Sequence, residues 1–415
     1  MRTSISATPL ASIAHIEMGQ SPDSSTVLEG DHGGVPFLQG NAEFGTPYPT
    51  PRFTCTAPMK MCRAGDILMS VRAPVGAMNI ADRDYCIGRG LAAIRVAGMS
   101  PTLASHMVST AVPALRRVAQ GTTFEAISKT DLASVVVMVP PQEDREPLSR
   151  VLDTLDTTIR QTEAIIEKLK HVKQGLLHDL LTRGIDANGE LRPPQSQAPH
   201  LYKDSLLGWI PCDWTTPPVS VLVRQVTYGF TNPMPTTLDG PWMLTAADIA
   251  DGHVDYSAAR KTSSREFARL SRKSRPSKGD ILVTKDGTLG RVALLDRENV
   301  CVNQSVAVLS PLDAGLGAFL TLYLRSPRGQ DRMIADAGGS TIKHIYITTL
   351  ADMLVPGPPV AEAFEIGQRA DALEQRIQLE VSQLLKLGML KSGLMDDLLT
   401  GRVRVTPLLQ SEAAL

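Results

Sequence analysis

The residues that could perform chemistry in this chain do not assemble into a complete catalytic motif. Residues 231–235 read TNPMP, which resembles in part the Asn-Pro-Pro-aromatic motif of amino-methyltransferases but lacks the aromatic residue that stacks on a flipped base. Gly315 and Gly317 form only a lone Gly-x-Gly, and the sequence contains no GxxxxGK[ST] loop for nucleotide phosphates. We therefore expect neither methyl transfer nor an ATP motor in this chain.

A nuclease site and a metal site can also be considered, and both lack partner residues. Asp280 and Lys285 lie in GDILVTKD, but no second acid precedes them at a suitable spacing, so a strand that enters a turn explains them better. His171 and His178 lie on one predicted helix. In the second copy of the internal repeat described below, neither equivalent position is a histidine. We predict a non-catalytic chain with no metal and no cofactor of its own.

Composition restricts the class of protein. The 415 residues allow two to four domains, and a hydrophobic fraction of 43% allows sizeable cores. There is no run of eighteen apolar residues and no apolar core of a signal peptide near the N-terminus, so we expect neither a membrane span nor secretion. The five cysteines are scattered and odd in number, which favours a reducing, cytoplasmic location over disulfide or zinc frameworks.

One segment is strongly basic although the net charge of the chain is only −1. Residues 260–278, RKTSSREFARLSRKSRPSK, contain eight basic residues and a single acid, Glu266. The segment is either a solvated loop or helix face, or a surface that follows a phosphate backbone.

The chain contains an internal repeat at offsets of 214 to 218 residues. One pair of segments contains Gly-Asp-Ile-Leu in both copies, and the last pair shares seven of thirteen residues without a gap. Such self-similarity indicates two copies of one structural unit. The aligned pairs are 63–76 with 277–290, 85–96 with 300–311, 121–132 with 339–350, and 173–185 with 391–403.

Each copy combines a mixed α/β part with a long helix. Short β-branched runs bounded by Gly, Pro or Ser predict strands, and Ser100 followed by Pro101 predicts the start of a helix. We predict an α+β fold with an internal pseudo-two-fold repeat. Its parts are 1–147 as the first globular domain, 148–185 as a helix, 186–200 as a polar linker, 201–361 as the second globular domain, 362–404 as a second helix and 405–415 as a tail.

The two predicted helices carry matching heptad seams. From 148 to 180 and from 366 to 398, steps of four and three residues select ten positions each, of which eight are apolar in both copies. The polar exceptions coincide: Thr162 with Glu380, and Lys173 with Lys391. One amphipathic surface helix could show such a seam by chance, but two matching seams predict an antiparallel coiled coil. Its predicted seam residues are Leu152, Leu155, Ile159, Ile166, Leu169, Leu176, Leu180, Leu373, Ile377, Leu384, Leu387, Leu394 and Leu398.

These features together resemble a type I restriction-modification specificity subunit over essentially the whole chain. The resemblance rests on the duplicated GDIL, on GTTFEAIS and GSTIKHI, on GWIPCDW, and on helix ends LLHDLLTRG and LMDDLLTGR. It implies two target recognition domains, each reading half of a split site in double-stranded DNA. It also implies a helical spacer that docks two adenine-methylating modification subunits, with faces near Asp179 and Asp397, and restriction subunits that complete the complex. S-adenosylmethionine, ATP and Mg would then be bound by those partners.

Under this resemblance, polar side chains in equivalent loops would contact bases, and cations would contact guanine or phosphate. An ordinary surface role remains open for each residue. The candidates are Gln20, Ser21, Ser24, Ser70, Arg72, Arg89, Thr122, Thr123, Thr231, Asn232, Arg260, Lys261, Arg272, Lys273, Thr284, Lys285, Gln304, Ser340, Thr341, Lys343 and His344. The alternative is a coiled-coil scaffold, or a DNA mimic, whose globular parts bind protein.

The shared polar positions generate a first prediction. If Thr162 and Glu380 fix the register of the helices, replacing both by leucine leaves the fold intact but allows several registers. Cysteine cross-linking between the helices measures this, and a single unchanged register would contradict it.

Overall fold

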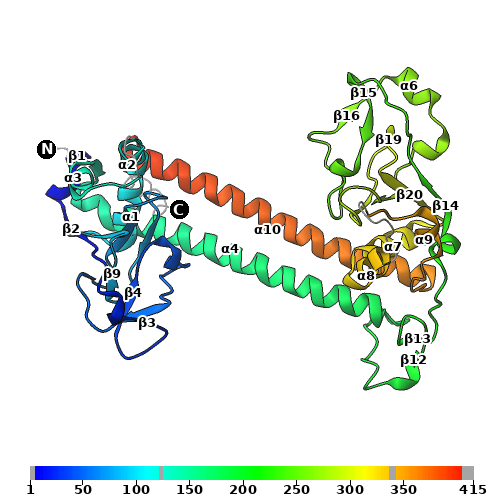
Figure 1. Cartoon of the computed structure of the whole chain (residues 1–415), viewed down its shortest axis with the longest axis horizontal. Coiled ribbons are helices and arrows are strands. Elements are labelled where there is room, and N and C mark those ends of the chain that lie inside the picture. Colours follow the sequence, from blue (N-terminus) through cyan, green and yellow to red (C-terminus); the bar gives the residue numbers. More distant parts are fainter. Residues whose placement is uncertain (1–4, 121–124, 336–342, 404–415) are drawn as a thin grey trace, which may run out of the picture. The chain divides into compact units, whose positions relative to one another are not determined.

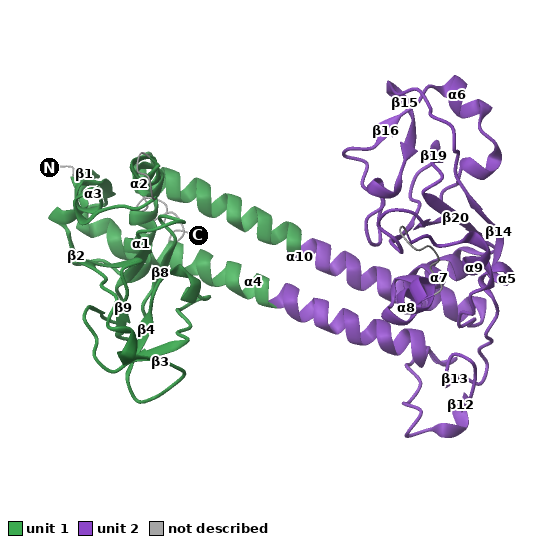
Figure 2. Cartoon of the chain, viewed as in Figure 1, with its two compact units in different colours: residues 1–164, 381–415 green, residues 165–380 purple. Residues whose placement is uncertain are grey.

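The computed structural model describes residues 5–120, 125–335 and 343–403. It divides the chain into two compact units, residues 1–164 with 381–415, and residues 165–380 (Figure 2). Each unit contains an α+β part together with one portion of each of two long helices, as Figure 1 shows for the labelled elements.

Three sheets and three short helices build the α+β part of unit 1. An antiparallel four-stranded sheet has the order β2 (Ala14–Met18), β10 (Leu91–Val96), β7 (Ile67–Ser70) and β8 (Met78–Ile80). A second sheet has the order β3 (Val27–Glu29), β5 (Phe53–Cys55), β4 (Val35–Leu38), β9 (Tyr85–Ile87) and β6 (Met61–Cys62). The third pairs β1 (Ser6–Pro9) with β11 (Val136–Val139), and the helices are α1 (Pro101–Ser109), α2 (Val112–Ala119) and α3 (Lys129–Ser134).

Unit 2 contains a four-stranded sheet of equivalent order. Its strands are β14 (Val223–Tyr228), β20 (Val306–Pro311), β17 (Ile281–Thr284) and β18 (Val292–Leu294). A second sheet contains β16 (Arg260–Lys261), β15 (Thr237–Leu244) and β19 (Val300–Val302), and β12 (Tyr202–Lys203) pairs with β13 (Ile210–Pro211). The short helices are α5 (Val219–Leu222), α6 (Ser264–Arg269), α7 (Ala314–Arg325), α8 (Pro327–Ala335) and α9 (Ile347–Asp352).

The duplicated Gly-Asp-Ile-Leu segment forms a turn followed by a central strand in both units. Gly65 and Gly279 have φ angles of 85° and 92°, which favour glycine. The next residue closes the turn: the Asp66 carboxylate accepts from the Arg63 amide (2.8 Å), and Asp280 accepts from Ser277 (3.0 Å). The repeat in the sequence therefore encodes a repeated local structure.

Apolar strand faces and short amphipathic helices form the cores. In unit 1, Ile67 and Ile94 of the sheet pack with Met107 of α1 and Leu115 of α2. The predicted start of α1 is confirmed, because the Ser100 hydroxyl accepts from the Leu103 amide (3.2 Å) and Pro101 occupies the first turn. In unit 2, α7 covers its sheet in the same way through Phe319 and Leu320.

The long helices are α4 (Gln142–Thr182) and α10 (Val360–Thr400), each 41 residues. The first long helix, α4, begins before the predicted 148 because a polar turn precedes its first apolar seam residue, and α10 begins two residues before the predicted 362. Both also end before the predicted 185 and 404, close to Gly184 and Gly401, whose φ angles of 64° and 79° suit helix ends.

Within each unit the two helix portions pack through the predicted seam. Leu148 and Leu152 of α4 cluster with Leu398 and Leu399 of α10 in unit 1. In unit 2, Leu180 and Leu181 of α4 share a cluster with Ala363 and Ile366 of α10. Leu152, Ile166, Leu180, Ile377 and Leu398 are at most 5% exposed, and the other eight predicted seam residues are half-buried.

The polar exceptions of the seam are satisfied inside each unit. Lys391 pairs with Asp156 in unit 1, and Lys173 pairs with Glu374 in unit 2. Burial raises the pKa of Asp156, but hydrogen bonds from His106 and Lys391 outweigh it, so the pKa is lowered. The hydrogen bond from Lys173 lowers the pKa of Glu374.

The other exceptions, Thr162 and Glu380, are both buried. The Thr162 hydroxyl donates to the Thr158 carbonyl oxygen (2.9 Å), and Glu380 pairs with Arg376 (2.6 Å).

The segment predicted to be a linker, 186–200, is anchored to unit 2 by Arg192. Its guanidinium donates to Glu362 (2.5 and 3.1 Å) and to Asp213 (2.7 Å). The Glu362 carboxylate also accepts from the Trp214 indole (3.0 Å) and the Ile185 amide (2.7 Å). One buried carboxylate in the first turn of α10 therefore holds the end of α4, the 186–200 segment and the GWIPCDW motif together.

In both units the chain enters and leaves the α+β part at neighbouring points. In unit 2, Thr215 and Gly357 exchange two backbone hydrogen bonds of 2.9 and 2.8 Å. In unit 1, Ser6 lies opposite Val139 in the pairing of β1 with β11. None of the described helices is both long and apolar enough to span a membrane.

Replacing Glu362 by alanine tests the carboxylate hub. The Arg192 and Glu362 side chains are only 9% and 8% exposed. Glu362→Ala leaves the buried guanidinium with Asp213 as its remaining carboxylate and the Trp214 indole without its acceptor, which lowers the free energy of unfolding by about 3–5 kcal/mol. Chemical denaturation measures the loss. The matched control is Glu365→Ala, which breaks the more exposed pair with Arg369 and costs below ~1 kcal/mol. Equal losses would contradict a special role for Glu362.

Candidate nucleic-acid interface

Four loops of unit 2 meet at one edge of its four-stranded sheet. The Lys285 amide, just after β17, donates to the Ser305 carbonyl oxygen (2.9 Å), and the Ile345 amide donates to Lys285 (3.0 Å). The Gln304 amide donates to the carbonyl oxygen of Phe230, just after β14 (2.8 Å). These bonds gather the 229–234, 285–290, 303–305 and 343–346 loops.

Unit 1 repeats this arrangement with the same backbone hydrogen bonds. The Val71 amide donates to Gly90 (2.9 Å), and the Ile127 amide donates to Val71 (3.0 Å). The Gln20 amide donates to Ile87 (3.0 Å), as the Phe230 amide donates to Val302 (3.0 Å) in unit 2. The two edges therefore share one scaffold, on which different side chains are mounted.

The structure brings most of the described candidate residues to these edges. In unit 1 the Arg89 amide donates to the Ser21 hydroxyl (3.4 Å), so those residues lie together beside Gln20. Ser24 is exposed in a short 3-10 helix capped by Asp23. Side chains exposed at the two edges belong to Gln20, Arg72, Arg89, Thr231, Asn232, Gln304 and Lys343. Thr122, Thr123, Ser340 and Thr341 lie outside the described residues.

Two candidates are corrected by the structure. Ser70 and Thr284 are buried, and their hydroxyls donate to Arg72 (2.8 Å) and Thr288 (2.5 Å) carbonyl oxygens. Both hydroxyls hold the turn after the strand and are not free to contact a base. The sequence pattern placed them in loops because it could not locate the last buried residue of each strand.

Unit 2 also contains a polar cluster that the sequence analysis identified only in part. The Asp286 carboxylate accepts from the Lys285 ammonium (2.8 Å) and from His344 Nδ1 (2.5 Å), and the Lys285 ammonium lies 5.5 Å from the Tyr228 ring centre. Burial raises the pKa of Asp286, but the hydrogen bonds from Lys285 and His344 outweigh it and lower the pKa. Asp286 and Tyr228 were missed, although Asp286 directly follows a candidate lysine in the sequence.

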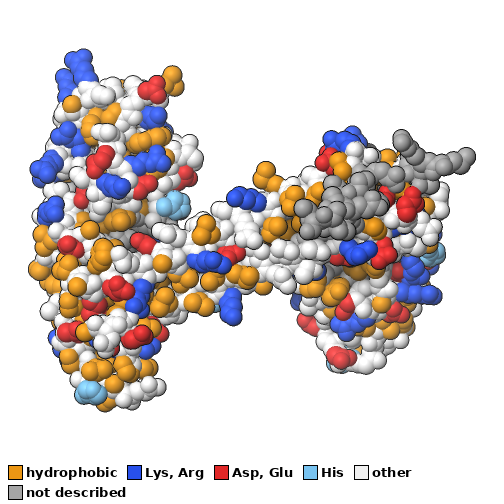
Figure 3. All heavy atoms as spheres, turned by 180° about the vertical axis from the view of Figure 1, so that it is seen from behind, with side chains coloured by type: hydrophobic (Ala, Val, Ile, Leu, Met, Phe, Trp, Pro, Cys, Tyr) orange, Lys and Arg blue, Asp and Glu red, His pale blue; other side chains and the backbone are white. Residues whose placement is uncertain are grey.

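Part of the basic segment lies beside the same loops. A cavity of about 430 Å³ is lined by Tyr228, Phe230 and Asn232 on one side and by Arg269 and Lys273 on the other. The Thr227 hydroxyl donates to the Lys273 carbonyl oxygen (3.3 Å), which fixes this arrangement. Lys and Arg side chains gather over this part of unit 2 in Figure 3. Exposed cations next to polar loops are suited to phosphates next to base edges.

The remaining basic candidates are placed differently. Arg272 is exposed in a 3-10 helix, Arg272–Ser274, that also contains Lys273. Arg260 and Lys261 form β16, where the Lys261 ammonium lies over the Trp242 ring (4.5 Å) and within 4.0 Å of Asp239. Lys261 is therefore engaged within its own sheet.

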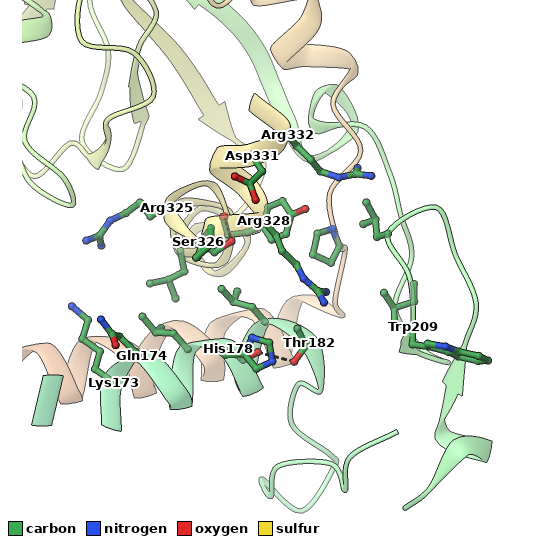
Figure 4. Close-up of a pocket in the computed structure, with 18 of the residues that line it drawn as sticks. Lys173, Gln174, His178, Thr182, Trp209, Arg325, Ser326, Arg328, Asp331 and Arg332 are labelled. Carbon is green, nitrogen blue, oxygen red and sulfur yellow. Dashed lines mark hydrogen bonds between the residues drawn. The ribbon is translucent and has the colours of Figure 1, made fainter. Parts of the chain in front are cut away.

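A larger cavity of unit 2, about 820 Å³, was not predicted from the sequence. Leu177 and Leu181 of α4, Tyr323 of α7 and Ile210 give it an apolar wall. Figure 4 shows Arg328 extending from the start of α8 toward α4, where His178 and Thr182 lie. Its apolar wall distinguishes this cavity from the polar loop edge.

The two residues considered for a nuclease site, Asp280 and Lys285, each have a local hydrogen-bond partner. Burial raises the pKa of Asp280, whose carboxylate closes a turn, while Lys285 is paired with Asp286. Within the described residues, no group of three or more His, Cys, Asp or Glu side chains could hold a metal ion.

Comparisons with known proteins identify relatives. A family model described as the type I restriction modification DNA specificity domain matches residues 7–171 and 237–387. A putative type I restriction enzyme MjaX specificity subunit of Methanocaldococcus jannaschii is 40% identical over 170 residues, 40% of each chain. The EcoBI specificity subunit of Escherichia coli is 26% identical over 278 residues, 64% of this chain and 58% of that relative. The matched parts thus span less than two thirds of either relative.

Two solved structures share the fold. The S subunit of a type I restriction-modification system from M. genitalium superposes with a TM-score of 0.58 at 13% identity, covering 95% of this chain and 96% of that one. A chain from structural work on complex assembly and conformational transition of the type I R-M system gives 0.55 at 16% identity, covering 96% and 98%.

The basic rim gives a prediction about salt dependence. Replacing Arg269, Arg272 and Lys273 by alanine removes three cations, so the slope of log affinity for duplex DNA against log salt falls by about two to three. Fluorescence anisotropy over a salt series measures it. The control replaces the exposed Arg160, Lys168 and Lys170 of α4, with the same change in net charge. An equal fall in both variants would show that net charge alone matters.

Proposed function

Because this chain belongs to the type I restriction modification DNA specificity family, we propose that it is the DNA-reading subunit of a restriction-modification complex. The observation that carries the proposal is the pair of loop edges built on one backbone scaffold with different side chains. Each unit reads one half of a bipartite site, and the complete site is asymmetric because the two edges differ.

The basic rim of unit 2 supports contact with double-stranded DNA. Arg269 and Lys273 line the cavity beside Asn232, so cations that hold a phosphate lie next to an amide that can pair with adenine. Arg89 in unit 1 and Gln304 in unit 2 occupy equivalent positions and suit guanine and adenine respectively.

The two long helices act as a spacer that pairs as an antiparallel coiled coil with pseudo-two-fold symmetry. Reciprocal ion pairs support this: Lys391 pairs with Asp156, and Lys173 pairs with Glu374. Both lysines and both acids are equivalent within the repeat at an offset of 218 residues. A 41-residue helix is about 60 Å long, enough to span more than one turn of B-DNA at about 34 Å. The spacer therefore sets the gap between the half-sites.

The outer faces of the helices dock two copies of an adenine-methylating modification subunit. On α10, Leu379, Leu385 and Met389 are 66%, 66% and 75% exposed although apolar, and on α4 Ile165 and Val172 are 45% and 48% exposed. Asp179 and Asp397 occupy equivalent places on the two faces. Restriction subunits complete the complex, and methylation, cleavage, S-adenosylmethionine, ATP and Mg belong to these partners. The complex acts in the cytoplasm.

Methylation mapping tests the function directly. The chain is expressed with its modification subunit in a host that lacks the motif, and long-read sequencing then identifies a split, asymmetric adenine motif. Replacing residues 1–147 by the equivalent part of a relative changes only one half of the motif. A scaffold or DNA mimic gives no motif and no salt-dependent binding to duplex DNA, which would refute the proposal.

The length of the spacer gives a separate prediction. Inserting one heptad at equivalent points of α4 and α10 keeps the seam in register and adds about 10 Å, so the gap in the motif grows by about three base pairs at 3.4 Å each. Inserting one residue in α4 alone breaks the seam and serves as the control. An unchanged gap in the heptad variant would contradict the spacer role.

A further inference from the structure

The backbone frame of this edge is repeated in unit 1, but the side-chain cluster on it is not. The cluster consists of Tyr228, Lys285, Asp286 and His344. Tyr228 lies opposite Ala307 in β20, and Met18 lies opposite Ala92 in β10. The Lys285 amide donates a hydrogen bond to the residue before β20, and the Val71 amide donates one to the residue before β10. By this equivalence the unit 1 residues are Met18 for Tyr228, Val71 for Lys285, Arg72 for Asp286 and Ala126 for His344.

The Asp286 carboxylate is unexpected at an edge that is proposed to bind DNA. Asp286 repels phosphates, so its presence opposes the attraction of the basic rim unless it holds other groups or receives a donor from a base. Both of its oxygens are engaged, one by Lys285 and the other by His344. Its side chain is 25% exposed and that of Lys285 is 17% exposed, so both are held in place while remaining open to solvent.

We propose that Lys285 and Asp286 together read one G·C base pair through the major groove, and that Arg72 reads a guanine in the half-site of unit 1. This deepens the proposed function and rests on it. In the pair, Lys285 donates to the guanine O6 and N7 acceptors, while Asp286 accepts from the cytosine N4 amine.

The geometry of the cluster matches this edge. The Lys285 ammonium and the Asp286 carboxylate lie 2.8 Å apart. The guanine O6 and cytosine N4 atoms are hydrogen-bonded to each other and so lie at a similar distance of about 2.9 Å. The Lys285 donor thus faces the guanine acceptor, and the adjacent Asp286 acceptor faces the cytosine donor. A T·A pair offers a similar O4 and N6, but it lacks the second acceptor of guanine and carries a methyl group.

His344 and Tyr228 position the pair. His344 holds one Asp286 oxygen from the 343–346 loop, and the Tyr228 ring lies beside the Lys285 ammonium. The stem of Lys285 therefore has a fixed direction before DNA binds, which reduces the entropy lost on binding. In unit 1, Arg72 is exposed, and its guanidinium fork can supply two donors to guanine on its own.

The test uses the full chain in complex with its modification subunit. Binding is measured to duplexes in which every base pair of both half-sites is replaced in turn. The wild-type chain discriminates against replacement of one G·C pair in the unit 2 half-site by about tenfold or more. Lys285→Met and Asp286→Ala lose the discrimination at that pair and keep it elsewhere, and Arg72→Met does so at a guanine of the other half-site.

The matched control is Arg297→Met in unit 2. Arg297 also lies over an aromatic ring, 4.1 Å from the Tyr256 centre, and beside an acid, Asp296, at 3.8 Å. This variant keeps the complete wild-type preference.

The outcomes separate the possible roles. If the cluster is purely structural, the Asp286→Ala protein binds every duplex more weakly by the same factor and has a lower melting temperature. That equal weakening would overturn the inference. A unit 2 half-site without a G·C pair would also overturn it. If the wild-type chain prefers T·A to G·C at the pair that Lys285→Met and Asp286→Ala affect, the assignment to guanine is wrong. A wild-type chain that binds no split motif refutes the proposed function instead.

Discussion

An apolar stripe that runs along a helix of 41 residues must be covered over its whole length, and a small domain at one end cannot cover it. Within each unit, part of the apolar stripe of one long helix is buried against the other long helix. Leu152 with Leu398 in unit 1, and Leu180 with Ile366 in unit 2, are the result. The α+β parts, their loop edges and the hub at Glu362 are all attached to these paired helices.

The polar residues of the seam favour one alignment of the two helices. A leucine seam alone tolerates shifts of one heptad, whereas a half-buried lysine is stable only opposite an acid. Lys173 and Lys391 each meet the acid that the repeat places on the other helix. Each ion pair therefore favours one alignment of the two helices within its unit.

Sequence patterns predicted the periodic and repeated features and missed those that depend on long-range contacts. The seam, the Ser100 cap and the duplicated turns follow from spacing and local propensity. The anchoring of 186–200 did not follow, because Arg192 in a Pro-rich polar segment gives no sign of its partner 170 residues away. Burial of Ser70 and Thr284, and the role of Asp286, likewise depend on which loop folds over which strand.

The neck formed by Thr215 and Gly357 has a consequence for how such chains diversify. Because the chain enters and leaves the second α+β part at two hydrogen-bonded residues, the backbone joins residues 216–356 to the long helices at one junction, while Phe319 also packs on Trp214. Genetic recombination at these two points exchanges the whole part in one event, and the foreign part must supply a side chain that packs on Trp214 as Phe319 does, with ring centres 5.6 Å apart. Exchange at the neck leaves the Arg192–Glu362 pair, which lies on the helical side, in the chain.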